Sequence, residues 1–187
     1  MRPTKVFRGT QSPLRNCATG DLDWVIIREN SEGEYAGQGG RSHQGRPWEI
    51  GTETAIFSRH GIERIMRFAF ETAQQRPRKL LTVVTKSNAQ RNGMVLWDEV
   101  AKAVSQEFPD VTVDKMLVDA MTTRMVLKPE TLDTIVATNL VCLGSFYQLV
   151  MKLTSTARRY PLRPCSCSGR FYRYRSHIKS RPYTRKP

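Results

Sequence analysis

The sequence predicts an α/β fold in which a mainly parallel sheet is covered by helices. Short apolar runs of strand length alternate along the chain with segments of helical periodicity, which is typical of parallel β-α-β units. Pro77 and Pro109 end the two long helical segments. Polar and charged residues follow directly after four of the predicted strands, as they do in sheets that bind ligands at one edge.

The first half of the chain predicts two strands, a loop or hairpin, and a helix. Residues 24–27 form an apolar run, which indicates a strand near 24–28 that is buried on both faces. Residues 31–51 are rich in Gly, Ser and polar side chains and predict a loop or a projecting hairpin. Residues 55–57 indicate a further short strand. From 59 to 75, apolar side chains recur at helical spacing.

The second half continues the alternation of strands and helices. The predicted strands lie near 80–84, 111–118 and 134–138, and the predicted helices span 94–108 and 120–127. The uncharged run 134–151 nearly reaches the length of a membrane span, but its amides and hydroxyls favour a buried strand followed by unrelated sequence. We therefore expect no membrane segment.

Charge divides the chain into two parts, which we treat as an α/β unit over residues 1–140 and a basic tail over 141–187. The whole chain of 187 residues has a formal net charge of +13, yet the tail holds 11 of the 30 Lys and Arg and none of the 17 Asp and Glu. The first part is thus not a basic nucleic-acid binder, and its composition excludes wholesale disorder. We expect the tail to be largely disordered from about residue 154.

Compartment and partners follow in part from composition. The four cysteines form no disulfide framework and the amino terminus has no secretory signal, so we expect a reducing, cytoplasmic setting. Residues 170–175 interleave arginines with aromatic side chains, as some single-strand binders do. Binding of nucleic acid or another acidic partner through the tail is therefore an alternative function, although no known binding module is present.

Four residues after successive strands point to a ligand site at one edge of the sheet. Arg28, Lys86, Asp119 and Asn139 each follow a predicted strand. Arg28 could hold a carboxylate with two parallel hydrogen bonds, Lys86 could act as a base, and Asp119 could be one ligand of Mg²⁺ or Mn²⁺. The alternatives are an Arg28–Glu ion pair, a surface lysine, and the ordinary polarity of strand ends.

The motifs along residues 1–140 resemble those of the metal-dependent β-decarboxylating hydroxyacid dehydrogenases, the isocitrate, isopropylmalate and tartrate/D-malate dehydrogenases. Residues 28–35 read Arg-Glu-Asn-Ser-Glu-Gly-Glu-Tyr and resemble the signature loop of the tartrate/D-malate branch. Residues 1–7, 85–88, 118–121 and 137–140 are similar to further family elements in the right order. The resemblance implies a partial isopropylmalate-dehydrogenase-like fold.

The resemblance also implies roles for five residues. Arg2 and Arg28 match two arginines that bind the substrate carboxylates, and Asp119 matches a ligand of the divalent metal. Tyr35 matches the acid that protonates the enol carbon, and Lys86 matches the group that takes the hydroxyl proton. The implied reaction is NAD-dependent oxidation of a small 2-hydroxy dicarboxylate such as tartrate or D-malate, with Mn²⁺ or Mg²⁺, in a homodimer.

Several family elements have no counterpart in these 187 residues. The Gly-Asp-Gly-Ile-Gly segment, a further substrate arginine, the adenine-binding loop and two of three metal carboxylates are missing, and residues 141–187 no longer resemble the family. We therefore expect a catalytically incomplete fragment that arose by a frame change, mis-splicing or a truncated gene model. A non-catalytic dimerisation fragment is the other interpretation.

Overall fold

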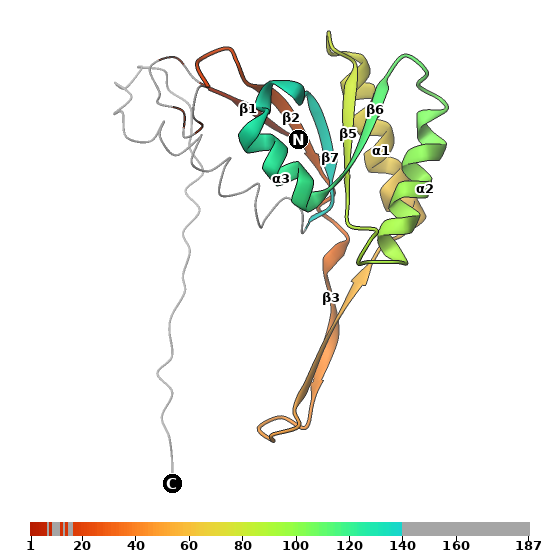
Figure 1. The fold of residues 1–187 in the computed structure, drawn as a ribbon. Coiled ribbons are helices and arrows are strands. Elements are labelled where there is room, and N and C mark those ends of the chain that lie inside the picture. Colours follow the sequence, from red (N-terminus) through yellow and green to blue (C-terminus); the bar gives the residue numbers. More distant parts are fainter. Residues whose placement is uncertain (7, 9–11, 13, 15–16, 140–187) are drawn as a thin grey trace, which may run out of the picture.

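A computed structural model of the chain describes residues 1–6, 8, 12, 14 and 17–139. Five strands form one sheet in the order β1 (Arg2–Lys5), β2 (Asp23–Arg28), β7 (Thr134–Ala137), β5 (Leu80–Thr85) and β6 (Thr112–Leu117). Within this sheet, β2, β7, β5 and β6 run parallel to one another, and only β1 is antiparallel to its neighbour. The predicted mainly parallel α/β sheet is confirmed (Figure 1).

Helices cover both faces of the sheet. On one face, α1 (Arg59–Gln74) and α2 (Gly93–Ser105) pack on β2, β5 and β7. Phe70 of α1 and Trp97 of α2 are fully buried in this contact. On the other face, α3 (Val118–Leu127) buries Met121 and Met125. A short 3₁₀ turn, η1 (Pro129–Thr131), then leads into β7. The two-sided cover explains why the central strands are continuous apolar runs.

A two-stranded ribbon projects away from this body. It consists of β3 (Gly33–Ser42) and β4 (Ile50–Ile56), which pair antiparallel, and every residue of β4 is exposed. The predicted hairpin is confirmed in place of the alternative loop (Figure 1). Residues 55 and 56 of the strand expected at 55–57 are the last part of β4, and residue 57 lies just after it. At the root of the ribbon, Gly33 has a φ of 90°, a backbone angle that a residue with a side chain rarely adopts.

Several predicted boundaries were wrong by a few residues. The helix expected over 94–108 ends at Ser105, because residues 106–108 form tight turns before Pro109. The helix expected from 120 begins at Val118, directly after β6. Helix α1 starts where it was predicted, since the hydroxyl of Ser58 caps it by accepting a hydrogen bond from the Gly61 amide at 3.0 Å.

Two further expectations were the disorder of the tail and the absence of a membrane segment. The expected disorder of the tail lies outside the described residues, as does most of the uncharged run 134–151. Within the described residues, no helix is both long enough and apolar enough to cross a membrane.

Candidate functional site

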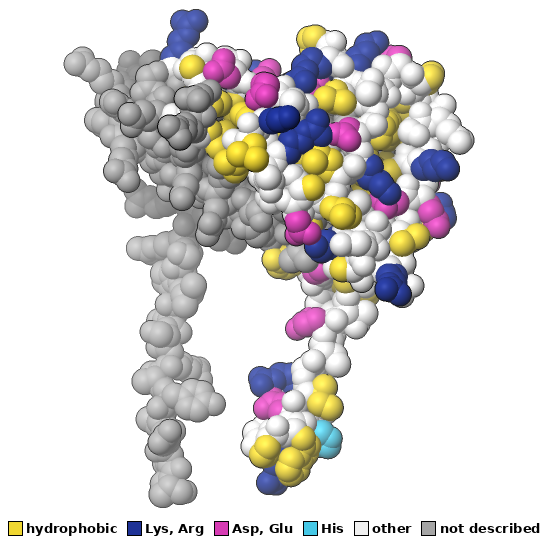
Figure 2. Space-filling model, viewed as in Figure 1, with side chains coloured by type: hydrophobic (Ala, Val, Ile, Leu, Met, Phe, Trp, Pro, Cys, Tyr) yellow, Lys and Arg dark blue, Asp and Glu magenta, His cyan; other side chains and the backbone are white. Residues whose placement is uncertain are grey.

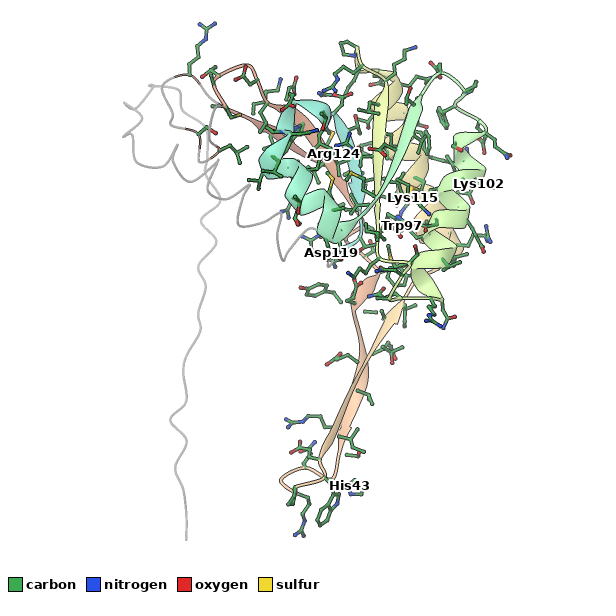
Figure 3. The ribbon with its side chains drawn as sticks, viewed as in Figure 1. His43, Trp97, Lys102, Lys115, Asp119 and Arg124 are labelled. Carbon is green, nitrogen blue, oxygen red and sulfur yellow. The ribbon has the colours of Figure 1, made fainter. Side chains whose placement is uncertain are left out.

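Four parallel strands bring their polar carboxyl-terminal residues to one edge of the sheet. Arg28 ends β2, Asn139 lies two residues after β7, Lys86 follows β5, and Asp119 lies two residues after β6. Parallel pairing of these strands places all four at the same edge, as the sequence predicted. The ribbon leaves the body at this end, and Asp119 faces the same end (Figure 3).

Arg28 and Asn139 are in direct contact. A guanidinium Nη2–H of Arg28 donates a hydrogen bond to Oδ1 of Asn139, which is buried. The Nε–H of Arg28 is also buried, and it has no hydrogen-bond partner among the described residues. A buried donor without a partner costs free energy, so this N–H is suited to a ligand oxygen. Among the described residues, the alternative ion pair of Arg28 with a glutamate does not form.

Lys86 and Asp119 form an ion pair across the edge. The Nζ of Lys86 lies 2.5 Å from Oδ2 of Asp119. The Lys86 side chain is 31% exposed and that of Asp119 is 72% exposed. Because exposed pairs are worth at most about 1 kcal/mol, a bound substrate could separate these two groups at little cost.

Arg2 and Tyr35 lie on different elements near the same edge. Arg2 begins β1 and pairs in register with Ile26, two residues before Arg28 on the neighbouring strand. Tyr35 is on β3 and is 57% exposed, in a stretch where the pairing register of the ribbon shifts between Gly33 and Gln38. The structure thus brings Arg28 into contact with Asn139 and Lys86 into contact with Asp119, whereas Tyr35 lies on the projecting ribbon.

A metal site is not complete within the described residues. They contain no group of three or more His, Cys, Asp and Glu side chains that could hold a metal ion. Asp119 offers one carboxylate, and Lys86 occupies it. Since Mg²⁺ and Mn²⁺ require several oxygen ligands, the described part of one chain does not fit such an ion on its own.

Two acidic residues of the loop after β2 were missed by the sequence analysis. Glu29 is buried, and its Oε1 accepts hydrogen bonds from the amides of Asn30 and Ser31 at 3.0 and 2.8 Å. Glu32 binds Ser58 at the start of α1. The signal that could have found the second contact is Ser58 itself, since serine before an apolar periodic segment is a typical helix cap.

The ionised form of the Glu32 carboxyl is stabilised by hydrogen bonds from Ser58 and by positive charges on α1. Burial of the Glu32 carboxyl acts to raise its pKa, but two hydrogen bonds from Ser58 and the charges of Arg64 and His60 outweigh that effect. The pKa of Glu32 therefore lies below its ordinary value. The carboxylate is thus the form that the folded structure favours.

Comparison with known proteins gives a consistent result. The family model described as "Isocitrate/isopropylmalate dehydrogenase" matches residues 1–142. A "Probable tartrate dehydrogenase/decarboxylase" of Agrobacterium vitis is 74% identical over 140 residues, which are 75% of this chain and 39% of that protein. The "D-malate dehydrogenase [decarboxylating]" of Escherichia coli is 43% identical over 140 residues, with the same coverage.

Solved structures agree with the sequence relatives. The crystal structure of isocitrate dehydrogenase from Methylococcus capsulatus superposes with a TM-score of 0.66 and 34% identity, over 74% of this chain and 40% of that one. The chain therefore spans about two fifths of the length of the curated relatives it matches. These findings confirm the resemblance predicted from the motifs.

Proposed function

The chain belongs to the isocitrate/isopropylmalate dehydrogenase family, and on that basis we propose that it carries the substrate and subunit-contact part of a tartrate/D-malate-type oxidoreductase. The observation that carries this proposal is the edge where Arg28 contacts Asn139 and Lys86 pairs with Asp119. In the complete enzyme, a small 2-hydroxy dicarboxylate would be oxidised with NAD in the cytoplasm.

Arg28 is suited to bind one carboxylate of the substrate. Its Nε–H is buried and unpaired among the described residues, and its Nη2–H is held by Asn139. A guanidinium fixed in this way presents its remaining donors in one plane, which matches the geometry of a carboxylate. Arg2, on the neighbouring strand, would bind the same substrate from the side of β1.

Lys86, as a neutral amine, would take the hydroxyl proton during hydride transfer to NAD. It must first part from Asp119 and give up its own ammonium proton to solvent, and the exposure of both side chains makes the separation inexpensive. Positioned proton transfer of this kind contributes about 10²–10⁴-fold to a rate. Tyr35 would return a proton to the enol carbon when decarboxylation follows, because its phenol can donate a proton from the ribbon.

Divalent-metal dependence is part of the proposal, but the described residues supply only part of the site. Asp119 would contribute one oxygen ligand to Mn²⁺ or Mg²⁺. The remaining ligands would come from outside the described residues, and the same holds for the NAD site.

A homodimer is proposed from the ribbon and the family. The ribbon exposes large apolar side chains, with Trp48 at 62% and Ile50 at 54% exposure, and Figure 2 shows apolar side chains at its tip. Exposed aromatic and aliphatic groups on a projecting element are typical of an interaction surface. The resemblance further implies that Lys86 and Asp119 serve the active site of the partner subunit, so that each site in the dimer would combine Arg28 of one chain with Lys86 and Asp119 of the other.

The experiment is a transplant into a longer relative. Residues 1–139 replace the matching segment of the Agrobacterium vitis protein, and NADH formation is measured with tartrate, D-malate and isopropylmalate in the presence of Mn²⁺. We expect turnover of tartrate or D-malate, and a loss of at least about 100-fold with Lys86→Ala. A folded chimera without turnover of any of the three would contradict the proposal.

A further inference from the structure

We propose that Glu32 is a positioning residue that fixes the root of the projecting ribbon and thereby sets where Tyr35 lies. This inference rests on the proposed role of Tyr35 as a proton donor. Nothing in the family resemblance assigns a role to Glu32, and the argument depends on its contacts alone.

The Glu32 carboxylate closes the ribbon at its root. Glu32 precedes β3, and Ser58 lies two residues after β4, so the two residues flank the ends of the ribbon. Oε2 of Glu32 accepts a hydrogen bond from the Ser58 amide at 2.8 Å, and Oε1 accepts one from the Ser58 hydroxyl at 2.6 Å. One side chain therefore ties the incoming strand to the outgoing strand with two charge-assisted hydrogen bonds.

The same contact joins the ribbon to α1. The Ser58 hydroxyl accepts a hydrogen bond from the Gly61 amide while it donates to Glu32, so the cap of the helix and the root of the ribbon share one atom. A carboxylate at this position is also favoured by the positive end of the helix dipole. Arg64, one turn further along α1, lies 3.5 Å from Glu29 and adds positive charge beside Glu32.

Gly61 leaves the space that the Glu32 carboxylate occupies. A Cβ atom at residue 61 would lie 2.6 Å from Oε2 and 2.9 Å from Oε1 of Glu32. Any larger residue there would push the carboxylate away from the helix. Gly61→Ala is thus a variant that disturbs the contact while both Glu32 and Ser58 keep their side chains.

Tyr35 depends on this root because the ribbon itself holds it weakly. Between the pairs Gly33–Ile56 and Gln38–Thr54 the register shifts, and Tyr35 lies within that stretch. Gly37, in the same stretch, has a φ of 69°. Besides the root, a hydrogen bond from Gln90 to the Glu34 carboxylate at 3.2 Å ties this stretch to the body. The position of Tyr35 relative to the body is therefore determined by the contacts at the ribbon root, next to Glu32.

The test follows Tyr35 by fluorine NMR in the full 187-residue chain. The six tyrosines are labelled with 3-fluorotyrosine, and the Tyr35 resonance is assigned by its loss in Tyr35→Phe. Hydrogen exchange of the amides at residues 33–37 and 56–58 is measured alongside. The variants are Glu32→Gln and Gly61→Ala, and the matched control is Glu53→Gln, which removes the same charge from an exposed position on β4.

The proposal predicts the same response from both test variants. Each should shift or broaden the Tyr35 resonance and speed exchange at the ribbon root about tenfold, while exchange in the central strands stays unchanged. Glu53→Gln should do neither. An unmoved Tyr35 resonance in both variants would overturn the proposal. Failure of Glu32→Gln to fold would also overturn it, because Glu32 would then support the sheet and not the ribbon.

This experiment is independent of the proposed enzyme activity. It reads the position of Tyr35 without substrate, cofactor or turnover, so it can fail while the transplanted segment is active. An inactive transplant would, conversely, leave the measured link between Glu32 and Tyr35 intact and remove only its catalytic purpose.

Discussion

Removal of the Arg76 side chain should destabilise the fold far more than removal of an exposed arginine. Arg76 follows α1, and its Nε–H donates a hydrogen bond to Oδ1 of Asp133 at 2.7 Å. Its Nη2–H donates to the carbonyl of Asp23 at 2.8 Å. The Asp133 carbonyl in turn accepts a hydrogen bond from the Val25 amide, so Arg76 joins α1 to the starts of β2 and β7.

Burial of Asp133 determines the magnitude. Its side chain is 2% exposed, and Oδ2 has no hydrogen-bond partner among the described residues. Arg76→Ala would leave this carboxylate buried without its counter-charge, a change that costs about 3–5 kcal/mol in proteins. We expect about 3 kcal/mol, because Arg76 is itself 18% exposed and water can replace part of it.

The assay is urea unfolding of the full chain, followed by circular dichroism. At an m value of about 2 kcal/mol/M, the expected loss lowers the unfolding midpoint by about 1.5 M. Arg67→Ala is the matched control, since Arg67 pairs with Glu63 and Glu107 at the surface and is 41% exposed. It should cost at most about 1 kcal/mol. Equal losses for the two variants would refute the reasoning from burial.

Three further predictions concern the root of the ribbon and the chain as a whole. The pKa of Glu32 is lowered in the folded state, so the ionised carboxylate contributes its full stabilisation when the pH is above the ordinary pKa of glutamate. This stabilisation is lost as the pH falls through the lowered pKa. Glu32→Gln should therefore flatten this part of the acid-unfolding curve. Gly93→Ala should destabilise the fold by about 1–3 kcal/mol in urea unfolding, because its Cβ would lie 2.2 Å from the ring of Phe57; an unchanged midpoint would show that the ring moves freely. A purified protein of these 187 residues should form no NADH from tartrate or D-malate with Mn²⁺, and measurable NADH that disappears with Lys86→Ala would contradict the expected incompleteness.

The central strands and long helices were predictable because local signals agree there. The run 24–27 is buried throughout, and the apolar periodicity of 59–75 corresponds to the buried face of α1, which contains Ile62, Met66 and Phe70. Helix ends were less predictable. Periodicity continues through residues 106–108, but the turns before Pro109 take over the backbone hydrogen bonds.

The placement of the candidate residues at one edge of the sheet was predictable, but their contacts with one another were not. The rule that ligands bind at the carboxyl ends of parallel strands brought Arg28, Lys86 and Asp119 to one edge without any knowledge of strand order. The contact of Arg28 with Asn139 depends on β2 and β7 being neighbours, although they lie far apart in sequence. The contact of Glu32 with Ser58 likewise depends on the return path of the ribbon.

Turnover by the transplanted segment tests the central claim most directly. Residues 1–139, placed in the matching position of the Agrobacterium vitis relative, should restore NADH formation from tartrate or D-malate with Mn²⁺. Arg28→Lys should then raise KM at least about tenfold, since lysine cannot form two parallel hydrogen bonds with a carboxylate. A folded chimera that turns over neither substrate would contradict the assignment of this edge as the dicarboxylate site. A chimera whose KM is unchanged by Arg28→Lys would contradict it as well.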